Sequence, residues 1–375
     1  MKKVLLGTSA IALASAFATA AHSAEWNVKV GGYHNQFLGF ASSDIQNNNT
    51  ADVDGVDVKQ NAEIFFLPSI TLDNGLKFGA NVQLESGGAT QTADTIDESF
   101  LYVKGSFGEI NLGSENSAGY KMTYGAPNVA IISYNSPSTP VFIPFSGNGS
   151  ASGLFRGTMA STYIENVRNN DADRITYYTP RFAGFQVGAS YARDANQDNN
   201  TQVDISTAGT VHDIFDIAAN YVNDFGGVNV AVSARWGIAT IEGANDEPTV
   251  LGFGANVGFG GVTLGGSWAE QNGSANGQLD GTSFDVGVKY ATGPWSFSAT
   301  WFHGENTDDE TLGGLTSAVQ DETLDTYGIG INYQLAKGVR LNGFAAYVDF
   351  DEEDNGATAR DVDGFVIGTG IGLSF

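Results

Sequence analysis

The fold is decided by the stretch Val228-Asn229-Val230-Ala231-Val232-Ser233-Ala234-Arg235-Trp236-Gly237-Ile238, whose side chains alternate in character with a period of two. One face is apolar and ends with Trp236 and Ile238. The other face carries Asn229, Ser233 and Arg235. Successive side chains of a β-strand point to opposite faces of its sheet. The stretch therefore predicts a strand that lies between an apolar and a polar environment.

The same alternation returns in residues 295–301 and in residues 365–375. A soluble β-sandwich also alternates, so the character of the polar face has to distinguish the two classes. That face is rich in Gly, Ser, Asn and Thr with an occasional Arg or Lys, and the apolar face carries aromatic rings near the strand ends. A wet interior and aromatic girdles that face lipid are typical of a transmembrane β-barrel.

Sixteen segments of this kind are expected, an even number, as closure of a bacterial antiparallel barrel normally requires. They are 26–40, 56–72, 76–84, 96–105, 109–114, 173–179, 185–192, 212–224, 228–240, 249–258, 262–271, 281–291, 295–306, 322–335, 339–349 and 361–375. Short glycine-rich turns alternate with long polar connections such as 42–55, 193–211, 307–321 and 350–360. The predicted fold class is therefore all-β, a transmembrane antiparallel β-barrel with both termini in the periplasm.

The N-terminal residues predict secretion. Met1-Lys2-Lys3 precedes a weakly apolar stretch from Val4 to Ala21, which is the layout of a cleaved signal peptide. We expect residues 1–24 to be the signal peptide and residues 25–375 to form one barrel domain. The formal net charge of −25 argues against nucleic-acid binding, which needs a basic surface, and no motif predicts a cofactor or a metal ion.

Four segments resemble the sixteen-stranded trimeric general diffusion porins of Gram-negative proteobacteria. They are the turn Leu72–Leu76, the segment Gly105–Gly113, the segment Asp173–Phe185 and the terminal Phe375. The resemblance implies a homotrimer among the lipids and lipopolysaccharide of the outer membrane, with passive diffusion of ions and small hydrophilic solutes and no enzymatic activity. One departure is Ser114. It follows the pair Leu112-Gly113, after which the family usually has an arginine.

A long connection from Glu115 to Ala172 is the most informative loop, because structureless connections are rarely this long without a function. In the family the third loop folds into the barrel and narrows it. The apolar stretches Val129–Ile132 and Pro140–Phe145 would be poorly placed in external water, and packing against the inner wall would bury them. Residues of about 115–172 are therefore expected to form the constriction loop.

Rings of fixed charges produce the electric field that acts on solutes inside a channel. In the family, basic wall residues face acidic residues of the inward loop, and Arg174 matches the wall arginine at the start of the sixth strand. Alternation places Lys59, Arg235 and Asp97 on the lumen face as well, with Asp97 at a position where relatives often carry arginine. The candidate constriction residues are Arg174, Lys59, Arg235, Glu165, Asp171 and Asp97. Each of them could instead be an ordinary solvated lumen residue.

Two alternatives to a channel remain open from the residues alone. An outer-membrane lipase or protease would need Ser, His and an acid or amide to converge at one rim. A structural or adhesive barrel would use its loops to bind partners while its lumen is blocked. Sixteen strands with a long third loop favour the channel.

Overall fold

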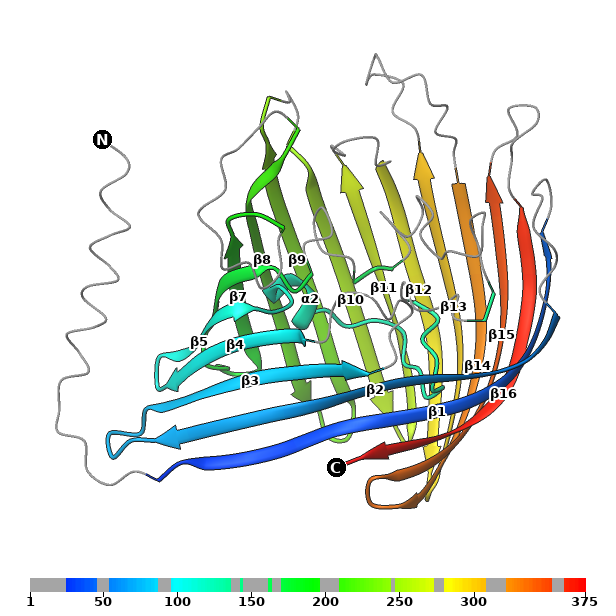
Figure 1. Cartoon of the computed structure of the whole chain (residues 1–375), viewed down its shortest axis with the longest axis horizontal. Coiled ribbons are helices and arrows are strands. Elements are labelled where there is room, and N and C mark those ends of the chain that lie inside the picture. Colours follow the sequence, from blue (N-terminus) through cyan, green and yellow to red (C-terminus); the bar gives the residue numbers. More distant parts are fainter. Residues whose placement is uncertain are drawn as a thin grey trace.

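The chain forms a closed antiparallel barrel of sixteen strands in which each strand pairs with the next and β1 pairs with β16 (Figure 1). The structure, a computed structural model, describes residues 25–45, 54–86, 96–135, 142–143, 161–163, 170–195, 209–243, 247–272, 280–307, 322–352 and 361–375. The strands are β1 (Asn27–Ile45), β2 (Asp54–Thr71), β3 (Lys77–Ser86), β4 (Ile96–Gly105), β5 (Gly108–Ser114), β6 (Asp173–Tyr178), β7 (Phe185–Ala192), β8 (Val211–Asp224), β9 (Asn229–Ile241), β10 (Thr249–Phe259), β11 (Val262–Asn272), β12 (Asp280–Thr292), β13 (Trp295–Thr307), β14 (Glu322–Ala336), β15 (Val339–Glu352) and β16 (Val362–Ser374).

All sixteen predicted strands are present, and the prediction of the fold class is confirmed. The largest differences between predicted and observed strand ends lie where long connections were expected to begin. Strand β1 continues to Ile45 and β15 continues to Glu352, because their backbones keep pairing with β16 and β14 beyond the predicted ends. Charged residues at those ends therefore belong to the barrel wall rather than to external loops.

The two faces of the wall divide as the alternation predicts. In β9 the side chain of Trp236 is exposed on the outer face, whereas Ser233 and Arg235 are buried on the inner face. Large apolar side chains such as Ile329 and Ile367 cover the outer face. An outer surface this apolar is suited to contact with acyl chains rather than water.

Wall height varies around the ring. Strands β5, β6 and β7 have 7, 6 and 8 residues, whereas β8 has 14 and β14 has 15. The wall is therefore low on one side, where the cyan strands lie in Figure 1. Among the described residues, no helix is both long and apolar enough to cross a membrane.

Candidate channel constriction

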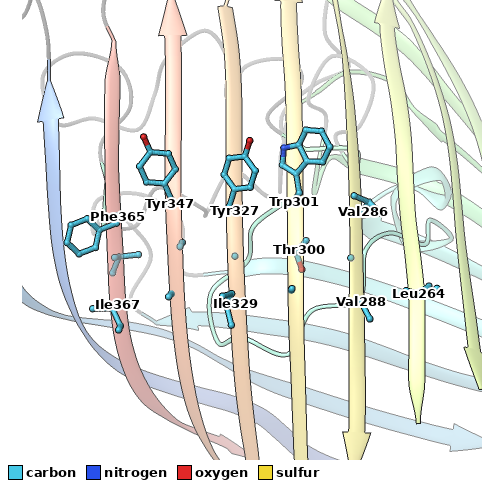
Figure 2. A pocket seen from close by; sticks show the side chains of 16 residues that line it. Leu264, Val286, Val288, Thr300, Trp301, Tyr327, Ile329, Tyr347, Phe365 and Ile367 are labelled. Atoms are coloured by element: carbon cyan, nitrogen blue, oxygen red, sulfur yellow. The ribbon is translucent and has the colours of Figure 1, made fainter. Parts of the chain in front are cut away.

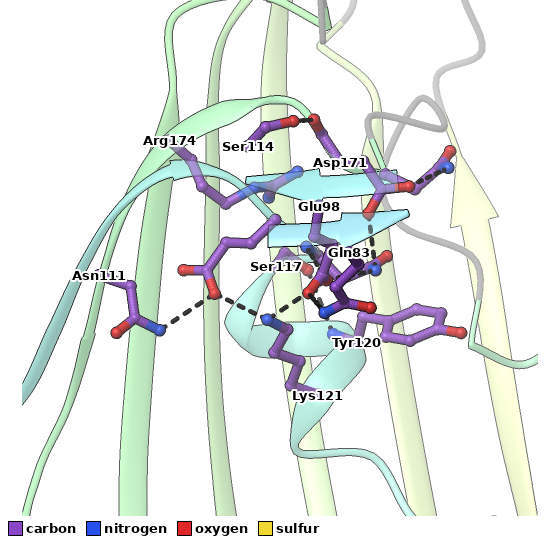
Figure 3. A network of polar contacts seen from close by, with 12 residues as sticks. Gln83, Glu98, Asn111, Ser114, Ser117, Tyr120, Lys121, Asp171 and Arg174 are labelled. Atoms are coloured by element: carbon purple, nitrogen blue, oxygen red, sulfur yellow. Dashed lines mark hydrogen bonds and ion pairs between the residues drawn. The ribbon is translucent and has the colours of Figure 1, made fainter. Parts of the chain in front are cut away.

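The long connection after β5 begins with a charge cluster whose carboxylates are buried (Figure 3). Lys121 ends the short helix α2 (Ala118–Lys121), and its Nζ lies 2.7 Å from Oε2 of Glu115 and 3.4 Å from Oε1 of Glu98. Glu115 is fully buried and Glu98 is 5% exposed. Burying carboxylates is costly unless a cation and hydrogen bonds compensate them, so Lys121 stabilises this end of the segment.

Amide side chains complete the cluster and join the two ends of the long connection. Nδ2 of Asn116 donates to Oε1 of Glu98 at 2.9 Å and to Oδ1 of Asp171 at 2.8 Å. Asn111 donates to Glu115, and the hydroxyl of Ser114 donates to the carbonyl of Asp171. We call Glu98, Glu115, Asn116, Lys121 and Asp171 the polar anchor.

From α2 onward the segment follows the inner wall, and its backbone amides donate to wall side chains at short intervals. The acceptors lie on five strands, β7, β9, β12, β13 and β15. The bonds run from Ala118 to Ser190, Tyr124 to Ser233, Ala126 to Asp285, Val129 to Ser298 and Ile131 to Asn342, at 2.7–3.0 Å. Unpaired buried backbone groups are costly, so these acceptors fix the path of the segment.

Wall glycines make room for this path. A Cβ atom at Gly254 would lie 1.7 Å from the carbonyl oxygen of Tyr124, and one at Gly330 would lie 2.5 Å from the amide nitrogen of Ala130. At Gly328 it would lie 2.2 Å from the ring of Tyr134. The expectation that the glycine- and hydroxyl-rich face touches water is therefore wrong at this level of β7–β15, because the face contacts the long segment instead.

The apolar part of the segment packs into a cluster inside the barrel. Ile132, Tyr134, Phe142 and Ile143 are buried against inner-facing side chains of β1 and β13–β16, including Phe344. The Tyr134 hydroxyl donates to the carbonyls of Ile329 and Ala345. Burial raises the pKa of Tyr134, so this hydroxyl keeps its proton and remains a donor. We call these four loop residues the apolar anchor.

Both predicted arginines lie against the long connection. Arg174 is 5% exposed, and its Nε donates to the carbonyl of Ala172 at 3.2 Å. Arg235 is 3% exposed, and its guanidinium donates to the carbonyls of Thr162 at 2.6 Å and Tyr163 at 3.2 Å. These hydrogen bonds hold the backbone of the long connection, and little of either side chain faces the lumen.

The other candidates differ in exposure. The Lys59 side chain is 33% exposed, and its Nζ lies 2.5 Å from Asp57 and 5.8 Å from the ring centre of Phe142. Asp171 is buried in the polar anchor, with a positive φ of 56°. Asp97 is half-buried at the register shift between β3 and β4. Glu165 lies outside the described residues.

Sequence reasoning missed Lys121, Glu98, Glu115 and Asp285. Lys121 is the one basic residue of 115–135, which is a weak signal for a functional cation. Asp285 lies on the polar face of β12 and accepts bonds from Ser267, Ala126 and Asn135. Within the described ranges, no group of three or more acidic, His or Cys side chains is placed to hold a metal ion.

Comparisons with known proteins agree on one class. A family model described as Gram-negative porin matches residues 7–353. An outer membrane porin protein of Bordetella pertussis is 25% identical over 412 residues and covers 99% of both chains. An anion-selective porin from Comamonas acidovorans aligns with a TM-score of 0.63 and 18% identity, over 94% of this chain and all of that one. A loop-deletion mutant of OmpT, an outer membrane protein of Vibrio cholerae, aligns with a TM-score of 0.59 and 14% identity, over 93% and 99%.

Proposed function

Because the chain belongs to the Gram-negative porin family, we propose that solutes pass between its tethered long segment and the inner wall formed by β2 and β3. The protein is an outer-membrane channel for passive diffusion. Residues of about 115–172 form the constriction, and the described part of this loop narrows the lumen by lining the inner wall from β7 to β16 and β1. The series of amide bonds to five strands is the observation that carries the proposal.

Inner-wall side chains that the loop covers are less exposed than those on the part of the wall that it leaves open. Ser298 and Asn342, which accept loop amides, are 5% and 3% exposed. On β2, the side chains of Lys59 and Asp57 are 33% and 60% exposed. Among the described candidate residues, Lys59 therefore meets solutes directly, while Arg174, Arg235 and Asp171 act by holding the loop.

The open wall favours cations. Glu63 on β2 and Glu85 on β3 face each other across the ladder, and both are half-buried. The charge of Lys59 is offset by Asp57, and the two wall arginines bind loop carbonyls. Fixed carboxylates along a wet path attract cations and repel anions, so we propose a preference opposite to that of the anion-selective Comamonas relative.

The short strands support a homotrimer. A tilted strand needs ~9–11 residues to cross the bilayer, and β5 and β6 have 7 and 6. Their outer faces nevertheless expose Leu112 and Ile175. Neighbouring subunits would cover this low wall, while lipids and lipopolysaccharide surround the taller strands.

Signal cleavage after residue 24 and two periplasmic termini complete the proposed arrangement.

We propose that the chain catalyses no reaction and is not primarily adhesive. The inner-wall hydroxyls of Ser190, Ser233 and Ser298 accept hydrogen bonds from loop backbone amides. That arrangement supports a structural use of these hydroxyls rather than a nucleophilic one.

Planar bilayer recording of the full mature chain tests the proposal. We expect stable ohmic steps and, in a KCl gradient, a reversal potential of the sign for cation preference. Glu63→Gln/Glu85→Gln should reduce that potential, whereas Asp73→Asn/Asp224→Asn, which removes two carboxylates beside hairpin turns, should change it less. Absence of steps would refute the channel, and anion preference in the wild type would refute the proposed path.

A further inference from the structure

The outer face of β11–β16 carries a groove of about 740 Å³ (Figure 2). Ala299 on β13 and Ala345 on β15 stand in one cross-strand row with Ile329 between them, so small side chains leave a hollow there. Val288 and Ile367 continue this row on either side. The volume is in the range of sites that bind small ligands, and the lining is apolar.

A row of rings closes the upper side of the groove. Trp301, Tyr327, Tyr347 and Phe365 are direct cross-strand neighbours, and Figure 2 shows them side by side above Ile329 and Ile367. The rings of Trp301 and Tyr327 stack with centroids 6.2 Å apart. Aromatic girdles mark the level at which acyl chains give way to head groups, so the groove lies at acyl-chain depth.

One step further along the same outward face is a row of carboxylates. Asp325 opposes Asp349, Asp349 opposes Asp363, and Asp363 opposes Asp44. We call these four residues the acidic row. Like charges directly opposite each other destabilise a sheet, and His303, bonded to Asp325, is the described group next in the row that can carry positive charge. The negative charge at head-group level therefore exceeds what the neighbouring wall compensates.

We propose that this groove binds a lipid with a positively charged head group, its acyl chain beneath the rings and its cationic group among the acidic row. Charge complementarity selects this occupant. An anionic head group at the same level would be repelled by the carboxylates, and a zwitterionic one would gain less. The proposal needs only that this face contacts the bilayer, and it is independent of which ions the channel prefers.

Native mass spectrometry of the full mature protein in detergent tests the site. The probes are three lipids with identical oleoyl chains and a trimethylammonium, a phosphocholine or a phosphoglycerol head group, the last with and without Mg²⁺. We expect the cationic lipid to be retained most strongly. Asp349→Asn/Asp363→Asn should weaken its retention by about tenfold, as expected for removing two nearby charges.

Matched variants separate the site from general effects. Glu242→Gln/Glu270→Gln removes two carboxylates outside the groove, one directly after β9 and one on β11, and should leave retention unchanged. Ala345→Leu should fill the groove and reduce retention, whereas Ala255→Leu, on the outer face of β10, should not. Channel conductance of each variant reports correct folding independently of lipid binding.

Three results would overturn the proposal. The first is equal retention of the cationic and phosphocholine lipids by the wild type. The second is stronger retention of the phosphoglycerol lipid when Mg²⁺ is present, which would indicate an anionic lipid bridged by a cation. The third is loss of the oligomer in Ala345→Leu, which would indicate that a second copy of the chain covers the groove.

Discussion

The two anchors of the long segment hold it by different physics. The polar anchor fixes α2 through two buried carboxylates, Glu98 and Glu115, which face the 29% exposed side chain of Lys121. The apolar anchor holds a middle part of the segment by burial of Phe142 and its neighbours against the wall. A buried charge cluster tolerates the loss of one partner poorly, whereas an apolar cluster tolerates conservative changes of shape. The position of the loop should therefore depend most on a single lysine.

The largest effect is expected from Lys121→Met, which leaves two buried carboxylates without their cation. We expect about 3 kcal/mol less stability at this end of the loop, together with larger and noisier single-channel steps. Bilayer recording and limited proteolysis of the folded protein would measure both. Adding Glu98→Gln and Glu115→Gln to Lys121→Met should restore quiet steps, since no buried charge then remains unpaired.

A matched control uses an exposed lysine. Lys104 pairs with Glu109 at 2.9 Å and is 46% exposed, so Lys104→Met should cost only ~0–1 kcal/mol. Equal effects of the two lysine variants on the channel steps would show that the polar anchor does not fix the loop.

A larger side chain at a wall glycine should displace the part of the loop that lies between the two anchors. Gly254→Val introduces a Cβ where the carbonyl of Tyr124 lies, and we expect a changed conductance with the barrel still folded. Gly258→Val on the same strand is the control, because the nearest atom to its Cβ is 3.4 Å away. Conductance unchanged in Gly254→Val would argue against contact between Tyr124 and β10.

The apolar anchor should respond less. Phe142→Leu keeps an apolar side chain of smaller volume, and we expect a cost below about 1.5 kcal/mol with little change in the size of the channel steps. Urea unfolding of the folded barrel, followed by tryptophan fluorescence, would give the change in free energy. A larger effect than that of Lys121→Met would reverse the ranking of the two anchors.

The smallest effect is expected on the open wall. Lys59→Met removes a partly exposed cation that Asp57 already offsets, so the reversal potential should move only slightly toward cations. Asp57→Asn should move it slightly the other way. A large change in either variant would mean that this pair lies at the narrowest point of the path.

The sequence predicts the barrel well because strand alternation is local. Each strand carries its own period of two, as in residues 228–238, and the turn glycines mark where it ends. Gly226 and Gly227 in the turn before β9 have φ values of 68° and 96°, the left-handed region that glycine adopts readily. No long-range information is needed for these features.

The constriction could not be predicted in the same way, because its contacts join residues far apart in the chain. The amide of Ile131 meets Asn342, and Asn116 meets Asp171. Alternation assigns Arg174 and Arg235 correctly to the inner face, yet it cannot tell a side chain that faces water from one that binds loop carbonyls. Glycines on the inner face were equally ambiguous, since an empty position can admit water or backbone.

Cross-linking of the loop to the wall tests the central claim most directly. A Cβ atom at Gly287 would lie 3.1 Å from that of Ala126, so a small separation of the two backbones brings them to the ~3.5–4.5 Å spacing of a disulfide, and the native chain has no cysteine. We predict that Ala126→Cys/Gly287→Cys forms an intramolecular disulfide under mild oxidation with wild-type conductance, whereas Ala126→Cys/Gly258→Cys does not form one. A folded Ala126→Cys/Gly287→Cys barrel whose cysteines stay reduced would contradict a loop fixed to the inner wall.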